Sequence, residues 1–295
     1  MRCQRDTMTH ALPYACFLIT VLAACKKGDR VPAYVEVPAV QVSSTPAQGS
    51  STSKVTDAWI TVDDKLIGVW ELPARLPVLA EGSHRIGVTP AIKRNGMFDD
   101  RLRYPFYTAW SGNVEFHKES TVVVNPVVGY TDVTDFWIED FEDPFTQFDL
   151  TSDSDTSLIR FVPSAYPELP YADNTACAGF RLDGAHRRAR IYTDEDFAAF
   201  GGPAFLEMDH RSDVVITVGT MYAHNGVQRS EPLVFVAPTK RSDGYMPWNK
   251  IYIDLALVFN TAVSQRDIYI EVSLPDGASS GEVYLDNIKL LRIAP

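Results

Sequence analysis

Apolar and polar residues alternate along short stretches of the chain, and turn-forming residues separate these stretches. Residues 57–62 alternate with a period of two, the next three residues (DDK) form a turn, and residues 66–70 return, which predicts a hairpin. A period of two places successive side chains on opposite faces of a sheet. Further strands with this period are predicted at 83–89, 113–117 and 121–125. The pattern therefore predicts a small β-sandwich over residues 55–133.

Short apolar runs continue through residues 134–295, with Gly, Pro, Asp and Asn between them. The predicted strands are 136–141, 158–162, 179–182, 189–193, 204–209, 214–221, 233–237, 249–254, 267–273 and 281–291. One short helix is predicted at 194–200, where acidic residues suit the first turn. A series of short strands without a strong helical period is typical of an antiparallel sandwich or barrel. We expect an all-β fold of two β-sandwich domains.

The segment 91–111 of the first sandwich is rich in Arg and aromatic residues and is predicted to be a long loop. Loops of this length are often functional. The segment therefore predicts either a binding loop or a loop that packs on its own sheet through Tyr104, Phe106, Tyr107 and Trp110.

An apolar stretch, residues 11–24, follows Arg2 and Arg5 near the beginning of the chain. It is shorter than the roughly 20 apolar residues that span a bilayer, and it has the form of a signal peptide. Its end, the run LAAC that finishes at Cys25, resembles the lipobox of bacterial lipoproteins, in which the Cys is acylated. The resemblance implies a lipoprotein signal peptide over 1–24, a lipid anchor on Cys25, and an outer-membrane location facing the cell surface or the periplasm. The alternative is an ordinary signal peptide with an incidental Cys.

Residues 25–54 contain prolines and small polar residues rather than a long periodic pattern. Residues 30–42 alternate only briefly and include Pro32 and Pro38, which predicts a lone edge strand because proline is tolerated at sheet edges. Residues 43–54 (SSTPAQGSSTSK) have the composition of a flexible linker or long loop. We therefore assign 25–54 to a lipidated N-terminus and linker.

Composition narrows the classes of function. The chain has 295 residues, of which 45% are hydrophobic and 22% charged, as in ordinary globular proteins. Its net charge of −11 argues against nucleic acid as a partner, because phosphate binding requires a positive surface. Removal of the signal peptide and acylation of Cys25 leave Cys177 alone, so we expect no disulfide and a small buried residue at Cys177. The sequence contains no zinc-hydrolase or phosphate-loop motif, and we do not expect an enzyme.

Two parts of the chain resemble known families. Residues 60–88 (ITVDDKLIGVWELPARLPVLAEGSHRIGV) resemble the small β-sandwich modules called PEGA-like, which are spacers or interaction domains of bacterial envelope proteins. Residues 138–143 (IEDFED) and 283–290 (VYLDNIKL) are similar to the opening and closing strands of galactose-binding-like jelly rolls, the fold of many carbohydrate-binding modules. Residues 205–210 and 248–255 are similar to interior strands of that fold. The resemblance implies that residues 134–295 form an antiparallel jelly roll.

A structural calcium ion is expected at the ends of this jelly roll. Its first and last strands lie near each other, which brings Asp140, Glu142 and Asp286 toward one place. Carboxylate oxygens suit Ca²⁺, which takes about six to eight oxygen ligands. The modules that the sequence resembles often hold calcium at this seam, and the match favours Glu142 and Asp286, with Asp140 as an outer ligand. Alternatively, these are solvated carboxylates at strand ends.

The same resemblance implies that the chain binds an extracellular glycan without catalysis. Sugar rings stack on exposed aromatic planes, and polar neighbours hydrogen-bond their hydroxyls. The candidates are residues of turn-rich segments, namely Tyr166, Tyr171, Tyr222, His224 and Tyr245, whose alternative role is to cover the ends of the sandwich. Two other functions stay open: a structural or assembly lipoprotein that docks to another envelope protein, and a glycoside hydrolase that uses some of the abundant carboxylates.

Overall fold

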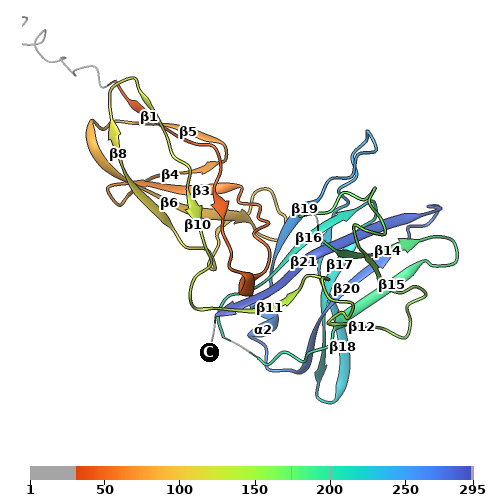
Figure 1. Ribbon diagram of the computed structural model, residues 1–295. Helices are drawn as coiled ribbons and strands as arrows, with labels where there is room; N and C mark the ends of the chain where they lie inside the picture. Colours follow the sequence, from red (N-terminus) through yellow and green to blue (C-terminus); the bar gives the residue numbers. More distant parts are fainter. Residues whose placement is uncertain (1–30, 174, 200, 294–295) are drawn as a thin grey trace, which may run out of the picture.

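The computed structural model describes residues 31–173, 175–199 and 201–293, and these ranges form an almost entirely β-stranded protein (Figure 1). The expected all-β class is confirmed. The helical elements are short, η1 (Pro46–Gln48) and α2 (Ala256–Phe259), and no helix in these ranges is long and apolar enough to cross a membrane. The predicted signal peptide and Cys25 lie outside the described residues.

The helix predicted at 194–200 is wrong, because residues 194–199 follow an irregular path. Tertiary contacts replace the helical ones there. Phe197 is buried in the core of the C-terminal domain, and its N–H donates to Arg266 O at 2.8 Å.

The N-terminal domain is a sandwich of short sheets. One sheet has the order β4-β3-β6-β7, with β8 also paired to β6, and the others have the orders β5-β1-β9 and β10-β2. The strands are β1 (Ala33–Val37), β2 (Gln41–Val42), β3 (Asp57–Val62), β4 (Lys65–Glu71), β5 (Ala74–Val78), β6 (Gly82–Lys93), β7 (Arg101–Arg103), β8 (Trp110–Phe116), β9 (Thr121–Val123) and β10 (Val127–Val128). The predicted hairpin is formed by β3 and β4. Side chains such as Val35, Ile60 and Val88 make up the buried core.

β1 lies in the middle of its sheet, so the prediction of a lone edge strand is wrong. Val35 is paired with Leu76 of β5 on one side and with Val122 of β9 on the other. Both prolines lie just outside the strand, Pro32 before it and Pro38 after it, so they remove no hydrogen bond from the ladder. The N-terminal sandwich therefore begins at β1 and not at residue 55.

The C-terminal domain is the predicted antiparallel jelly-roll sandwich. A six-stranded sheet has the order β13-β14-β21-β16-β19, with β11 also paired to β21, and the other sheet has five strands in the order β12-β15-β20-β17-β18. The strands are β11 (Thr134–Glu139), β12 (Phe148–Leu150), β13 (Ile159–Phe161), β14 (Cys177–Leu182), β15 (Arg188–Thr193), β16 (Ala204–Ser212), β17 (Ile216–His224), β18 (Val227–Val236), β19 (Asn249–Asp254), β20 (Ser264–Ser273) and β21 (Gly281–Ile293). Every strand predicted in this domain is present, and β12 is an additional one. Leu206, Ile253 and Ile270 are buried between the sheets, and Cys177 is buried and free, as predicted.

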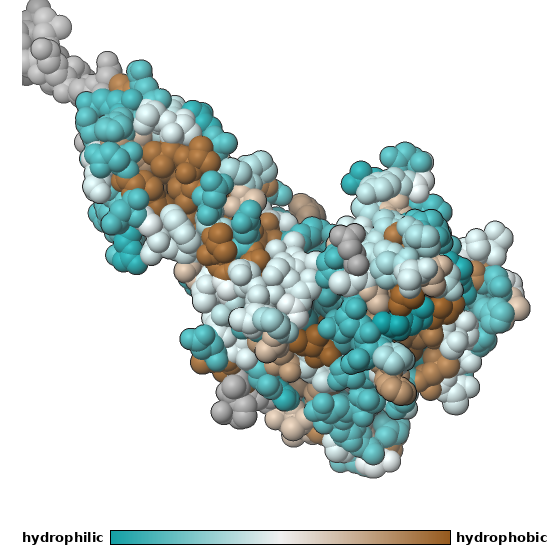
Figure 2. Space-filling model, in the orientation of Figure 1, coloured by the Kyte–Doolittle hydropathy of each residue, from teal (hydrophilic) through white to brown (hydrophobic). Residues whose placement is uncertain are grey.

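The outer surface of the N-terminal domain carries exposed apolar side chains. Figure 2 shows apolar surface gathered on this domain. Leu66 and Ile67 of β4 and Leu79 after β5 are exposed, and Ile67 and Leu79 line a depression of about 420 Å³. An apolar surface of this kind is suited to contact with another molecule.

The two domains share a hydrophobic interface on the outer face of the six-stranded sheet. Phe205 of β16 and Tyr252 of β19 belong to the same buried cluster as the core of the N-terminal domain. The ring centre of Tyr104 lies 5.2 Å from that of Phe205 and 5.0 Å from that of Tyr252, edge to face in both pairs. The aromatic residues of segment 91–111 therefore pack across the domain boundary, and not only on their own sheet.

Residues 43–54 are held against the same face of the sheet. The Lys289 Nζ donates to Ser50 O at 2.6 Å, and the Lys54 N–H donates to the Tyr252 hydroxyl at 2.9 Å. Within the segment, the Ser44 hydroxyl hydrogen-bonds to a backbone carbonyl at 2.6 Å. Because specific hydrogen bonds bind these small polar residues, the segment is a packed part of the domain interface rather than a flexible linker.

Candidate functional site

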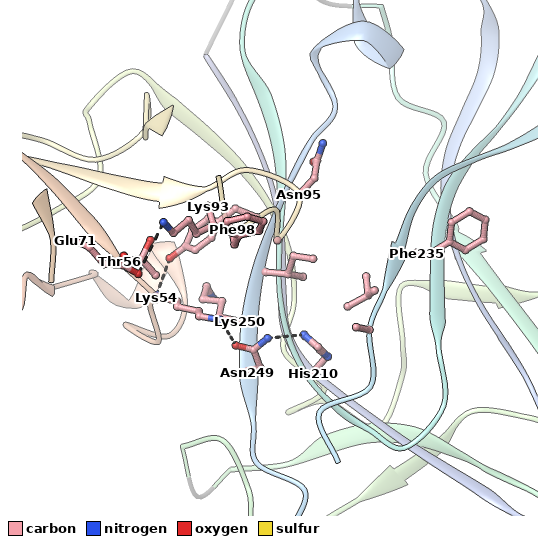
Figure 3. Close-up of a pocket in the computed structure, with 15 residues that line it drawn as sticks. Lys54, Thr56, Glu71, Lys93, Asn95, Phe98, His210, Phe235, Asn249 and Lys250 are labelled. Atoms are coloured by element: carbon pink, nitrogen blue, oxygen red, sulfur yellow. Dashed lines mark hydrogen bonds and ion pairs between the residues drawn. The ribbon is translucent and has the colours of Figure 1, made fainter. Parts of the chain in front are cut away.

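A cleft of about 400 Å³ opens where the N-terminal domain meets one side of the C-terminal sandwich (Figure 3). The N-terminal domain contributes Lys54, Thr56, Glu71, Lys93 and the turn after β6. The C-terminal domain contributes residues of β16 and β19 from one sheet and the end of β18 from the other. Ligand sites often lie at such junctions between domains.

Two phenyl rings are exposed at this cleft. Phe98, in the turn after β6, is 82% exposed, and Phe235, on β18, is 69% exposed. In β18 the neighbouring Val234 and Val236 pack toward the core of the sandwich, so the period of two turns Phe235 outward. Removing such apolar surface from water against a ligand is favourable. The rings are therefore sites where an apolar face of a ligand gains binding energy.

The turn that carries Phe98 is fastened to the C-terminal domain. The Asn95 N–H donates to Tyr252 O at 2.8 Å, and Asn95 Oδ1 accepts the N–H of Asp254 at 2.8 Å. The Arg94 guanidinium pairs with the Asp254 carboxylate at 3.3 Å. The ring is thus presented on a fixed backbone, which lowers the entropic cost of binding.

Polar groups form a chain of hydrogen bonds across the cleft (Figure 3). Lys54 Nζ donates to Asn249 Oδ1 at 2.6 Å, so the Asn249 amide turns its NH₂ group toward His210 Nε2, 3.2 Å away. Because an NH₂ group only donates, Nε2 is the acceptor and the proton of the neutral imidazole sits on Nδ1. His210 is 1% exposed, and burial, followed by the charge of Lys54, lowers its pKa to about 4. The imidazole is therefore neutral at physiological pH.

The lysines of the cleft differ in how their charge is balanced. Lys93 Nζ lies 3.1 Å from the carboxylate of the buried Asp57, and Lys250 Nζ lies 3.4 Å from the Glu207 carboxylate. Lys54 donates to a neutral amide instead, and no carboxylate of the described residues pairs with it. Burial lowers the pKa of Lys54, because removal from water disfavours the charged form.

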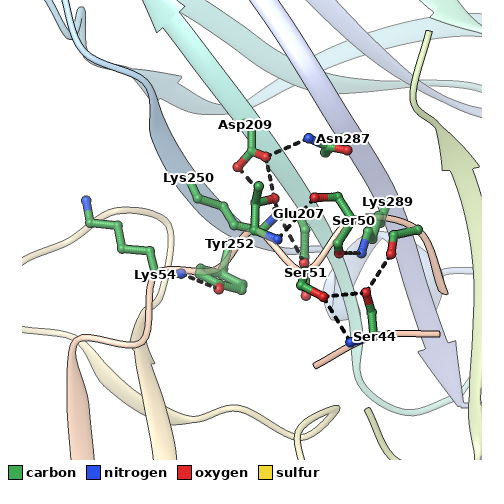
Figure 4. A network of polar contacts seen from close by, with 12 residues as sticks. Ser44, Ser50, Ser51, Lys54, Glu207, Asp209, Lys250, Tyr252, Asn287 and Lys289 are labelled. Atoms are coloured by element: carbon green, nitrogen blue, oxygen red, sulfur yellow. Dashed lines mark hydrogen bonds and ion pairs between the residues drawn. The ribbon is translucent and has the colours of Figure 1, made fainter. Parts of the chain in front are cut away.

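Charged side chains are buried between the domains behind the cleft (Figure 4). Glu207 of β16 lies beside Lys250 in Figure 4 and pairs with it. Glu207 also accepts hydrogen bonds from the hydroxyls of Tyr104 and Tyr130 at 2.9 Å each. Burial and the charge of Glu207 raise the pKa of Tyr104 well above its ordinary value, so the hydroxyl keeps its proton and donates. Buried charges are tolerated when they have such partners. This network therefore holds the N-terminal domain on the sheet.

The aromatic residues predicted to bind sugar are divided between the two sheets. Tyr166 and Tyr171 lie together: the Tyr171 hydroxyl donates to Tyr166 O at 3.0 Å, and both pack partly buried on a cluster that contains Phe161 and Tyr284. The residue after Tyr245 belongs to that cluster, and Tyr245 itself is 59% exposed. The structure thus brings two of the predicted segments to one side of the six-stranded sheet.

Tyr222 and His224 lie on β17 of the other sheet. The Tyr222 hydroxyl donates to the Glu231 carboxylate at 2.6 Å, and His224 is exposed at the end of the strand. None of the predicted sugar-binding residues is among the described residues that line the cleft. Their part in binding stays a prediction.

Of the carboxylates predicted to hold calcium, Asp140 and Glu142 follow β11, and Asp286 lies on the neighbouring strand β21. Glu142 accepts the Ala176 N–H at 2.8 Å, and Asp140 accepts the Glu142 N–H at 3.2 Å. Asp286 is buried with its Oδ2 unpartnered in the part of the chain that is described, and burial, followed by the charge of Asp173, raises its pKa to about 9. No three Asp, Glu, His or Cys side chains in the described ranges are grouped as metal ligands. The residues thus form no ready-made calcium site, and calcium here stays a prediction.

No protein-family model and no curated protein matches this chain. Among solved structures, the chain is similar to a family 61 carbohydrate-binding module in complex with β-1,4-galactotriose, with 12% identity over 49% of this chain and 86% of that chain and a TM-score of 0.29. It is similar to a family 28 module specific for non-crystalline cellulose, with 13% identity over 53% of this chain and 92% of that chain and a TM-score of 0.36. It is also similar to a family 27 module of Caldicellulosiruptor saccharolyticus in complex with mannohexaose, with 15% identity over 52% and 96% and a TM-score of 0.35. At these values the assignment of a β-sandwich rests on the strand pairing described above.

Proposed function

We propose that this protein binds a glycan in the cleft between its domains without acting on it chemically. The observation that carries the proposal is that two exposed rings, Phe98 and Phe235, line the same cleft as the hydrogen-bonding side chains of Lys54 and Asn249. The C–H faces of sugar rings stack on aromatic planes, while amine and amide groups hydrogen-bond the hydroxyls. The cleft combines both kinds of group on a fixed backbone.

The lining of the cleft favours binding over hydrolysis. Glycoside hydrolysis normally uses a pair of carboxyl groups that flank the scissile bond. Among the described residues, Glu71 is the one carboxylate that lines the cleft. A single carboxylate can accept a hydrogen bond from a hydroxyl, but it does not supply both an acid and a base.

Phe98→Ala and Phe235→Ala are each expected to weaken glycan binding by about fivefold, since an aromatic contact contributes about 1 kcal/mol. Both rings are exposed, so neither substitution should lower the melting temperature by more than a few degrees. Affinity electrophoresis against a panel of soluble polysaccharides selects a ligand, and calorimetry then measures the two variants.

Phe145→Ala is the matched control, because Phe145 is an exposed phenyl ring outside the cleft. Wild-type affinity in both Phe variants would remove the cleft as the binding site. If Tyr245→Ala, Tyr166→Ala or Tyr171→Ala weakens binding instead, the site lies on the tyrosine segments predicted from the sequence.

We also propose that the mature protein is anchored in the outer membrane through Cys25, which the LAAC run supports. Cys25→Ser is expected to abolish incorporation of a labelled fatty acid, because serine offers no thiol to acylate. Labelling of growing cells followed by immunoprecipitation measures the incorporation. Equal label on wild type and variant would refute the anchor.

A second function, docking to another envelope protein, is favoured by one observation. Ile67 and Leu79 are exposed around a depression on the N-terminal domain. Co-purification of an envelope protein that is lost in Ile67→Ser, without any shift on glycan gels, would favour docking over glycan binding.

A further inference from the structure

Lys54 is a cation of the cleft that the described carboxylates do not balance. Lys93 lies 3.1 Å from Asp57, and Lys250 is paired with buried carboxylates. Lys54 Nζ donates at 2.6 Å to Asn249 Oδ1, an amide oxygen without formal charge. The cleft therefore retains a positive charge that a ligand can use.

The carboxylate that lines the cleft does not neutralise this charge. Glu71 lies 4.0 Å from Lys93 Nζ and 3.5 Å from Arg101 Nη2, and the same two cations also pair with Asp57, so two carboxylates are offset by two cations. His210 lines the cleft as a neutral imidazole and adds no charge of either sign. Lys54 thus determines the sign of the charge that the cleft offers.

Lys54 is held in place before any ligand arrives. Its backbone N–H donates to the Tyr252 hydroxyl at 2.9 Å, and its Nζ is fixed on Asn249. The neighbouring Thr52 hydroxyl hydrogen-bonds to Asp209. A long side chain that is already positioned loses less rotamer freedom on binding, and more of the gain from a charge-assisted hydrogen bond remains.

We propose that the cleft selects an acidic glycan and that Lys54 binds its anionic group, a uronate carboxylate or a sulfate ester. This inference rests on the proposed glycan binding and names the class of sugar. Phe98 and Phe235 provide apolar contacts to the glycan, and Lys54 provides the charge selectivity. Because the whole chain carries a net charge of −11, its general surface repels polyanions, and selectivity for one depends on this local cation.

The test measures binding of the full-length protein to polygalacturonate and to the same polymer after reduction of its carboxyls, by affinity electrophoresis and calorimetry. Alginate, and dextran sulfate against dextran, extend the panel to a second uronate and to sulfate. The variants are Lys54→Met, which keeps the apolar stem without the charge, and Lys54→Arg, which keeps the charge. Lys240→Met is the control, because Lys240 pairs with Asp213 at 3.2 Å outside the cleft.

Wild type is expected to bind at least one acidic polymer about tenfold more tightly than its neutral counterpart. Lys54→Met should lose that preference, whereas Lys54→Arg and Lys240→Met should keep it. Binding of the sulfated polymer alone, with the same dependence on Lys54, supports the inference with sulfate as the anionic group. Equal binding of acidic and neutral polymers, or an unchanged preference in Lys54→Met, overturns it but leaves the proposed glycan binding intact. Failure of wild type to bind any polymer overturns both.

Discussion

Replacing Glu207 by alanine is expected to destabilise the protein by about 3 to 5 kcal/mol, the usual cost of breaking a buried ion pair. Glu207 is fully buried, accepts the hydroxyls of Tyr104 and Tyr130, and pairs with Lys250. Alanine leaves the Lys250 ammonium buried with one carboxylate fewer and deprives two buried hydroxyls of their acceptor. Urea unfolding followed by tryptophan fluorescence measures the loss.

Two further variants separate the charge from the packing. Glu207→Gln keeps an acceptor of similar volume, so it should cost less than Glu207→Ala. The double variant Glu207→Leu with Lys250→Met removes both charges and should cost less than the sum of the single losses. An exposed ion pair contributes at most about 1 kcal/mol to stability. If Glu207→Ala lowers the free energy of unfolding by less than that, the buried network is contradicted.

The second large expected effect is that the free energy of unfolding depends on pH, because the buried carboxyl of Asp286 changes its protonation. Burial, and then the charge of Asp173, raise the pKa of Asp286 from its ordinary value of 3.8 to about 9. The folded state therefore holds this proton more tightly than the unfolded chain does. The contribution of Asp286 to stability is full below about pH 4 and is lost as the pH rises toward 9, by at most about 1.4 kcal/mol for each pH unit.

Asp286→Asn cannot ionise and is expected to gain stability over wild type progressively from pH 5 to pH 8. Urea unfolding at each pH gives the difference between the two proteins, in which the titration of all other groups cancels. Asp276→Asn is the control, because the Asp276 side chain is fully exposed. Parallel stability curves for wild type and Asp286→Asn would show that Asp286 is already ionised in the folded protein.

The same unfolding experiments test the calcium ion predicted from the sequence. A cation that binds only the folded state stabilises it by about 2.7 kcal/mol at 100-fold over Kd. If calcium takes the place of the proton on Asp286, wild type gains this stability at pH 7 and Asp286→Asn does not. If the urea unfolding curves of wild type are identical with calcium and with a chelator, calcium does not bind at Asp286, and the carboxyl keeps its proton.

The strands could be predicted because the period of two is a local property. The predicted boundaries of 57–62 and 249–254 coincide with β3 and β19. β1 was harder to interpret, because the prolines that suggested an edge lie at positions 32 and 38, outside the ladder. The packing of residues 43–54 could not be predicted from composition, since the contacts with Tyr252 and Lys289 join residues 198 and 239 positions apart in the sequence.

The cleft was missed for a related reason. Phe235 lies in the predicted strand 233–237, and alternation with Val234 and Val236 turns it outward, but the strand pattern does not show that the N-terminal domain packs beside it. Phe98 lies in the segment 91–111, the predicted binding loop, in which the later aromatic residues Tyr104, Phe106 and Tyr107 are buried instead. No pattern in the sequence indicates that these two rings and Lys54 line the same cleft, because the cleft forms only where one domain packs on the other.

The shared core has a consequence for the independence of the two sandwiches. Phe205, Tyr252 and Leu291 belong to strands of the C-terminal domain, yet their side chains are buried with the core of the N-terminal domain. A fragment cut at residue 134 turns these apolar side chains to water and leaves Glu207 without its two tyrosine donors. The boundary near residue 134 therefore separates two sets of strands that share one buried cluster, and we expect the two sandwiches to unfold together.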